Sequence, residues 1–183
     1  MLNKKIKIAV IGAGWFGCHI GYKLIKKKFK VQIFEKEKDI FQNASGNNTN
    51  RLHLGFHYPR SFQTRKMSFE GYKQFIKEYP SLSKPLKNNI YVIAKSKLNK
   101  TKSNLYEKSM FRSNLSFSKL DPKKTDLINI KKTFKTSERA INHDKAKIFF
   151  KKKLKGKILF KKKIRSFKKI HNKYQIDNKI YDF

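Results

Sequence analysis

Residues 6–17 read Ile-Lys-Ile-Ala-Val-Ile-Gly-Ala-Gly-Trp-Phe-Gly, and this stretch decides the fold. Its first half is a short run rich in β-branched residues, which is typical of a buried parallel strand. Gly12 and Gly14 interrupt this run, and from Trp15 to about Lys28 the apolar residues recur at helical spacing. The stretch therefore predicts a strand, a tight glycine turn and a helix, in that order.

The spacing of three glycines, Gly12, Gly14 and Gly17, is that of a dinucleotide-binding turn. The first glycine permits a tight turn, the second lets the backbone approach a pyrophosphate, and the third lets helix and strand pack closely. The N-terminus of the following helix offers its N–H groups to phosphate. A second strand, Val31–Phe34, ends at Glu35, whose carboxylate can accept hydrogen bonds from ribose hydroxyls and would repel a 2′-phosphate. These elements predict a βαβ unit that binds an adenine dinucleotide other than NADP.

Composition limits the class of protein. The chain has 183 residues and a formal net charge of +34, carried by 40 lysines and only 6 arginines. Lysine, isoleucine, phenylalanine, asparagine and tyrosine all use codons rich in A and T, so biased codon use explains the charge better than selection for a polyanion, which favours arginine. Aromatic residues make up 14% of the chain, which excludes a disordered protein, and the single Cys18 excludes an internal disulfide.

Targeting signals are weak in this sequence. No apolar run approaches the roughly 18 residues that a membrane-spanning helix needs. The apolar part of the N-terminus is short and broken by glycine, so we do not read it as a signal peptide and expect a cytoplasmic protein.

Further elements follow along the chain. Apolar periodicity predicts helices at Phe62–Tyr79 and His143–Leu154, strands at Ile90–Ala94 and Lys157–Phe160, and β-like pieces at 164–167, 174–176 and 180–183. Residues 95–135 are weakly patterned and receive no element. We expect residues 6–11, 31–35 and 157–160 to be neighbouring parallel strands. The last residues look like the start of another strand, which favours a truncated sequence.

Two segments resemble a known family. Lys7–Gly17 together with Val31–Lys36 is similar to the N-terminus of FAD-dependent oxidoreductases of the D-amino-acid oxidase, glycine oxidase and L-2-hydroxyglutarate dehydrogenase type. Asn43–Gly55 resembles the Ser/Gly/Asn loop that wraps the pyrophosphate and passes beside the flavin in that family. The resemblance is specific over the first 60 residues and covers only the order of elements thereafter.

The resemblance implies an α/β fold: a Rossmann-like FAD-binding domain with part of an α+β substrate domain and a β-meander. The implied division is residues 1–84 for the FAD-binding unit, 85–142 for a partial substrate domain and 143–183 for the return to the FAD-binding domain. The implied function is FAD-dependent oxidation of a C–N or C–O bond of a small amino or hydroxy acid. A fragment that is inactive by itself is a further hypothesis.

The resemblance and the glycine motif together give a set of candidate cofactor-binding residues. They are Gly12, Ala13, Gly14, Trp15, Phe16, Gly17, Glu35, Lys36, Ser45, Gly46, Asn50, Arg51, Leu52 and His53. Some relatives carry a histidine at the place of His53 that is bonded covalently to the flavin, while in others this region only packs against the ring. We expect Ser45–Gly55 to fold over the glycine turn. The sequence identifies no catalytic residue, and no Cys/His cluster has the spacing of metal ligands.

Two alternatives stay open at this point. An NAD-dependent dehydrogenase would continue with regular βα repeats after Glu35, whereas a long polar loop follows here. A basic nucleic-acid-binding protein would use the lysine runs 26–28, 151–153 and 161–163, but no aromatic-interleaved RNA-binding signature accompanies them. We therefore expect a small-molecule substrate as the partner, with no nucleic acid and no membrane span.

Overall fold

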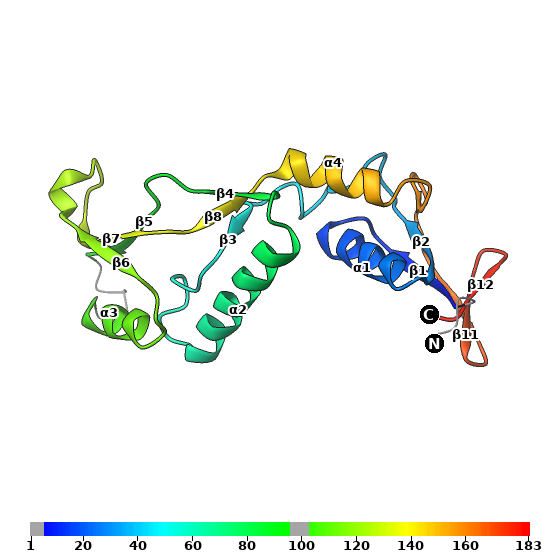
Figure 1. Cartoon of the computed structure of the whole chain (residues 1–183), viewed down its shortest axis with the longest axis horizontal. Coiled ribbons are helices and arrows are strands. Elements are labelled where there is room, and N and C mark those ends of the chain that lie inside the picture. The colour runs from blue at the N-terminus through cyan, green and yellow to red at the C-terminus, as the bar shows by residue number, and fades with distance from the viewer. Residues whose placement is uncertain (1–5, 96–102) are drawn as a thin grey trace. The chain divides into compact units, whose positions relative to one another are not determined.

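A computed structural model of the chain describes residues 6–95 and 103–183. The chain divides into two compact units: the residues up to Asn48 with His143–Phe183 form the first, and Thr49–Asn142 form the second. Figure 1 labels most of the helices and strands of each unit. The sequence-based division after residues 84 and 142 stays a prediction. No helix in the described ranges has both the length and the apolar character needed to cross a membrane.

The first unit is built on a parallel sheet. Its strands are β1 (Lys7–Ile11), β2 (Lys30–Phe34) and β9 (Ile158–Leu159), in the order β1-β2-β9. Both pairings are parallel, so the predicted set of neighbouring parallel strands is confirmed. Because the carboxyl ends of parallel strands share one edge, the turn after β1 and the residues after β2 and β9 meet there.

Two helices, α1 (Trp15–Lys26) and α4 (His143–Lys153), contact each other in this unit (Figure 1). Gly21 lets α1 approach the sheet closely, because a Cβ there would lie 2.6 Å from the Cδ1 of Ile33. Both helices end in lysines, which favours the negative end of the helix dipole. The lysine runs 26–28 and 151–153 therefore have a structural explanation.

An ion pair fixes α4 to the loop after β2. Lys147 and Lys151 place their Nζ atoms 2.9 Å from the two carboxylate oxygens of Asp39. Burial alone would raise the pKa of Asp39, but the hydrogen bonds from these lysines and from the N–H of Ile40 lower it to about 2. Asp39 is therefore ionised wherever the lysines are charged, and α4 stays in register with the loop.

An antiparallel meander of β10 (Lys168–Ile170), β11 (Lys173–Ile176) and β12 (Lys179–Tyr181) follows β9. The predicted β-like piece at 164–167 is wrong, because pairing with β11 begins only at Lys168. Ile164 instead packs against a cluster of Phe34, Ile176 and Tyr181. After β12, the N–H of Asp182 donates to the Lys7 carbonyl at 2.8 Å, so these residues lie at the edge of the parallel sheet.

The described residues of the second unit form two small sheets and two α-helices. One sheet has the order β3 (Arg51–Leu52), β8 (Arg139–Ile141) and β4 (Ser83–Pro85); the other has the order β5 (Ile90–Ala94), β7 (Ile130–Thr136) and β6 (Phe117–Leu120). The helices are α2 (Phe62–Glu78) and α3 (Ser103–Phe111), and a short 3-10 turn covers Pro122–Lys124. The predicted helix at 62–79 and strand at 90–94 are confirmed. Residues 103–135, which received no element, contain α3, β6 and most of β7.

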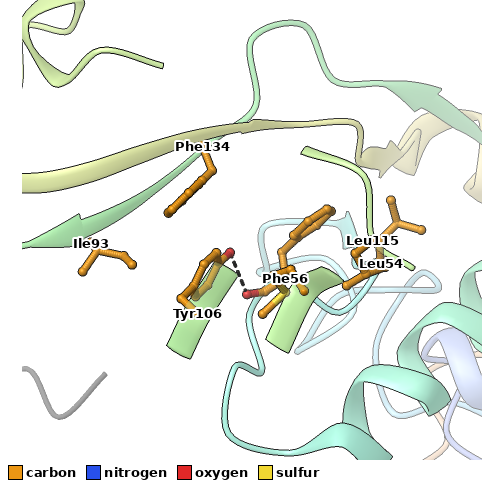
Figure 2. Packing of buried hydrophobic residues seen from close by; sticks show 7 residues of the cluster. Leu54, Phe56, Ile93, Tyr106, Leu115 and Phe134 are labelled. Atoms are coloured by element: carbon orange, nitrogen blue, oxygen red, sulfur yellow. Dashed lines mark hydrogen bonds between the residues drawn. The ribbon is translucent and has the colours of Figure 1, made fainter. Parts of the chain in front are cut away.

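An aromatic core holds this second unit together, as Figure 2 shows. Phe134 of β7 is fully buried, and the ring of Tyr106 stacks on it with centroids 5.0 Å apart. The Tyr106 hydroxyl donates to the Phe56 carbonyl at 3.1 Å, drawn as the dashed line in Figure 2. Leu54 and Phe56 belong to the same core. The segment that carries His53 is therefore anchored on both sides of Gly55.

Candidate functional site

The glycine turn after β1 has a backbone that side chains would not tolerate. Gly12 has φ +95°, in the left-handed region that favours glycine. A Cβ on Gly17 would lie 1.9 Å from the carbonyl oxygen of Gly12, which is far inside van der Waals contact. The turn and the first turn of α1 thus touch backbone to backbone, as the spacing of the motif predicts.

Ser45 lies directly against this turn. Its Oγ accepts a hydrogen bond of 2.8 Å from the N–H of Trp15, the first residue of α1. A Cβ on Gly14 would come within 3.1 Å of the same Oγ. The prediction that the polar loop folds over the glycine turn is therefore confirmed for Ser45.

The carboxylate of Glu35 closes the other side of the turn. Its Oε2 accepts from the N–H of Ala13 at 2.5 Å, and its Oε1 accepts from the N–H of Glu37 at 3.0 Å. The residue is buried, with 6% of its surface exposed. Within the described ranges no lysine forms an ion pair with it. The Glu35 carboxylate therefore points towards the glycine turn.

These groups surround a cavity of about 390 Å³ in the first unit. The cavity lies at the carboxyl edge of the parallel sheet, where α/β folds bind ligands. Its lining residues come from all three strand ends and the polar loop: Ile11, Gly12, Gly14, Phe34, Glu35, Lys36, Gln42, Asn43, Ala44, Ser45, Lys162, Lys163 and Ile164. A bare glycine turn, a helix N-terminus, a carboxylate and lysines are the groups that a pyrophosphate and a ribose require. The residues present therefore fit the adenosine diphosphate part of FAD.

Other predicted residues of the first unit build the turn and do not line the cavity. The Trp15 indole stacks on Phe41 with centroids 5.6 Å apart and meets Phe150 edge-on at 5.3 Å. The Phe16 side chain is 80% exposed. Gly46 makes the polar loop compact, because a Cβ there would lie 2.0 Å from the Phe41 carbonyl oxygen. Ala13 and Gly17 take part through their backbones, as described above.

The sequence analysis missed part of the lining. Gln42, Asn43 and Ala44 directly precede Ser45, and their polar, irregular sequence was the available signal. Lys162 and Lys163 follow β9, so their place could have been found from the rule that parallel strands end at one edge. Lys162 also forms an ion pair of 2.6 Å with Asp177.

Asn50, Arg51, Leu52 and His53 belong to the second unit. The Asn50 carbonyl accepts from the N–H of Ile141 at 2.7 Å, and Leu52 pairs with Arg139 in the β3·β8 ladder. The Arg51 guanidinium donates to the Asn89 side-chain oxygen. A cofactor-binding role for these four residues stays a prediction.

His53 lies beside a buried carboxylate that the sequence analysis did not identify. Its Nδ1 is 3.4 Å from Oε2 of Glu138, a residue that is 1% exposed. Glu138 also accepts from the Leu54 N–H at 2.8 Å and from the Tyr91 hydroxyl at 2.9 Å. Burial alone would raise the pKa of Glu138, but the hydrogen bonds from His53, Leu54 and Tyr91 lower it below its ordinary value. The one feature of the sequence that could have drawn attention to Glu138 is the scarcity of acidic residues, of which the whole chain has 12.

Cys18 is a structural residue. It is fully buried in α1, and its Sγ lies 3.4 Å from the Ala13 carbonyl oxygen. Burial and the nearby Glu35 carboxylate raise the pKa of the thiol to about 12, so it is not a nucleophile at neutral pH. Within the described ranges no three His, Cys, Asp or Glu side chains are grouped to hold a metal ion.

Replacing Glu35 by alanine is expected to weaken FAD binding by about 1–3 kcal/mol, because the ribose hydroxyls would lose their acceptor. Flavin fluorescence during titration measures this affinity. The matched control is Glu37→Ala, which removes a neighbouring carboxylate paired at the surface with Lys36 and leaves the Glu37 N–H in place. Equal affinities for FAD in the two folded variants would contradict the assignment of Glu35.

Comparisons with known proteins agree with this geometry. Residues 7–160 match the family model described as DAO, FAD dependent oxidoreductase. The FAD-dependent monooxygenase FPY4 of Fusarium mangiferae is 34% identical over 176 residues, which is 96% of this chain and 47% of that protein. The mitochondrial L-2-hydroxyglutarate dehydrogenase of Caenorhabditis elegans is 32% identical over 80 residues, 40% of this chain and 18% of that protein.

A solved structure shares the fold. L-α-glycerophosphate oxidase of Mycoplasma pneumoniae, reduced with dithionite and with FAD bound, superimposes with a TM-score of 0.73 at 17% identity, over 96% of this chain and 50% of that one. The chain thus spans at most about half the length of these relatives. The family match favours FAD over NAD and over nucleic acid as the ligand. On the sequence motif, the cavity and the family match together, the chain belongs to the DAO family of FAD-dependent oxidoreductases, whose cofactor is FAD.

Proposed function

We propose that the protein to which this chain belongs oxidises the C–O bond of a small 2-hydroxy acid, with the C–N bond of an amino acid as the alternative substrate. The observation that carries the proposal is the cavity at the glycine turn with Glu35 on its wall. FAD bound there supplies the acceptor for a hydride. The name of the L-2-hydroxyglutarate dehydrogenase relative supports the choice of a hydroxy acid.

Oxidation of an alcohol needs a base as well as a hydride acceptor. The substrate carbon loses a hydride, the hydroxyl loses a proton, and the products are a carbonyl group and the reduced cofactor. The family resemblance implies that the segment of His53 passes beside the flavin, and this supports the proposal. His53 is the one histidine of that segment, and histidine is the side chain that most often serves as a general base in enzymes. We therefore propose that His53 accepts the proton of the substrate hydroxyl group.

Anaerobic mixing of the FAD-loaded protein with candidate substrates tests the proposal. A 2-hydroxy acid is expected to bleach the visible flavin absorbance, and the corresponding acid without the hydroxyl group is not. Reduction by an amino acid alone would select the C–N alternative. Reduction by NADPH, with no response to either acid, would instead indicate a monooxygenase like the relative FPY4 and would overturn the proposal.

The partner and location belong to the same proposal. A small-molecule substrate suffices for a member of this family. The cytoplasmic location that the sequence analysis expects stays part of this proposal.

A further inference from the structure

The contact between His53 and Glu138 orients the imidazole ring of His53. The Glu138 side chain is fully buried, whereas the His53 side chain is 34% exposed. The ring therefore has its Nδ1 edge against the protein interior and keeps part of its surface accessible. A buried carboxylate beside one ring nitrogen is the arrangement that orients the histidine of a Ser-His-Asp triad.

Two oxygen atoms lie at the same distance from Nδ1. Oε2 of Glu138 and the hydroxyl oxygen of Tyr91 are each 3.4 Å away. An ionised carboxylate can only accept hydrogen bonds. The Tyr91 hydroxyl directs its own proton to Oε2 of Glu138 at 2.9 Å, so towards His53 it too presents a lone pair. Both neighbours of Nδ1 are therefore acceptors.

Glu138 and Tyr91 both keep these roles at neutral pH. The three hydrogen bonds that Glu138 accepts hold its pKa below the ordinary value, so it is ionised. Burial, together with the nearby Glu138 charge, raises the pKa of Tyr91 and keeps its hydroxyl protonated. Among the described residues, other titratable groups near this cluster are Tyr106, Tyr72, Arg51 and His57. The ring centroid of His57 is 5.7 Å from that of His53.

We propose that Glu138, together with Tyr91, holds the neutral His53 ring with its proton on Nδ1, which leaves Nε2 as the nitrogen that accepts a proton. Glu138 is thus a positioning residue for His53. The use of Nε2 in catalysis rests on the proposed function: Nε2 would accept the O–H proton of the substrate, and FAD, when bound, would supply the acceptor for the hydride. The imidazolium that forms keeps its Nδ1–H against the carboxylate.

Nuclear magnetic resonance of the 183-residue chain, labelled with ¹⁵N-histidine, tests the tautomer directly. Two-bond ¹H–¹⁵N correlations at about pH 9, well above the ordinary pKa of histidine, show which ring nitrogen is protonated. His53→Asn identifies the signals of His53 among the five histidines. We expect the Nδ1–H pattern for His53. An Nε2–H pattern would overturn the proposal.

Three variants test whether Glu138 sets the tautomer of His53. Glu138→Gln is expected to abolish the preference for Nδ1–H, because the neutral amide no longer favours a donor at that nitrogen. Glu107→Gln is the matched control: it removes a carboxylate of the same unit that pairs with Lys119 and Lys132, and the His53 pattern should not change. Tyr91→Phe keeps the Glu138 carboxylate and should retain the Nδ1–H pattern of His53. This variant tests the role of Glu138 if Glu138→Gln does not fold.

An unchanged Nδ1–H pattern in folded Glu138→Gln would overturn the role of Glu138, and loss of that pattern in Tyr91→Phe would do the same. The measurement needs neither FAD nor substrate. A failed flavin-reduction experiment therefore leaves this result standing, and a failed tautomer experiment leaves the proposed oxidation of a 2-hydroxy acid standing.

Discussion

Substituting Gly17 with alanine is expected to abolish FAD binding and to destabilise the fold by about 3 kcal/mol, at the upper end for an added methyl group in a packed site. The new Cβ would lie 1.9 Å from the carbonyl oxygen of Gly12 and 3.0 Å from its carbonyl carbon. Both atoms are backbone, so relief requires α1 to move away from β1. That movement would separate the glycine turn from the N-terminus of α1, which together form the expected binding site for the pyrophosphate.

Gly71→Ala is the matched control for this substitution. Gly71 lies inside α2, and a Cβ there would meet nothing within 4 Å. Alanine favours a helix interior over glycine by roughly 0.5–1 kcal/mol, so this variant should be as stable as the parent chain or more so. Chemical denaturation and flavin titration measure the two effects. A Gly17→Ala chain that folds and binds FAD like the Gly71→Ala chain would show that the close approach is not required.

Truncating Phe134 to alanine is expected to cost about 3–5 kcal/mol, the usual penalty for removing a fully buried aromatic ring. Phe134 is 0% exposed and contacts Tyr106 and Phe117, whose rings lie 5.0 and 5.2 Å from it between centroids. The empty space left by the missing ring would lie in the core of the second unit, which contains Leu54 and Phe56 on the two sides of Gly55. We therefore expect the second unit to become less stable and the position of the His53 side chain to become less well defined.

Phe111→Ala serves as the control, because Phe111 is 80% exposed at the end of α3. Its removal should change the free energy of unfolding by no more than about 0.5 kcal/mol. Urea denaturation followed by tyrosine fluorescence compares the two variants. Similar losses of stability in both would mean that the aromatic cluster is not the core of this unit.

The βαβ unit could be predicted because its determinants are local. The β-branched runs, the three glycines and Glu35 lie within 30 residues, and each has one physical role in the turn. The strand at 158–159 could be predicted from its apolar residues, and its parallel pairing followed from the crossover rule. The structure of residues 164–167 could not be predicted in this way. Ile164 is an apolar residue that packs against Phe34 and takes no part in strand pairing.

The environment of His53 could not be predicted because its contacts are distant in sequence. Glu138 is 85 residues away and Tyr91 is 38 residues away, and they meet His53 only because the second unit brings their elements together. Residues 103–135 gave no clear pattern because their apolar residues are few and spread among lysines and asparagines. Their helix and strands form around Tyr106, Met110 and Phe134, so they depend on tertiary packing.

The central claim is that the cavity beside Glu35 recognises the adenosine half of FAD. Equilibrium titration of the chain with FAD and with FMN, which carries the same flavin ring but no adenosine, tests it most directly. The structure predicts that FAD binds more than about tenfold tighter than FMN, a difference of roughly 1.4 kcal/mol, and that Glu35→Ala removes most of this difference. Equal affinity for FAD and FMN, or a preference for FAD that survives Glu35→Ala unchanged, would contradict the claim.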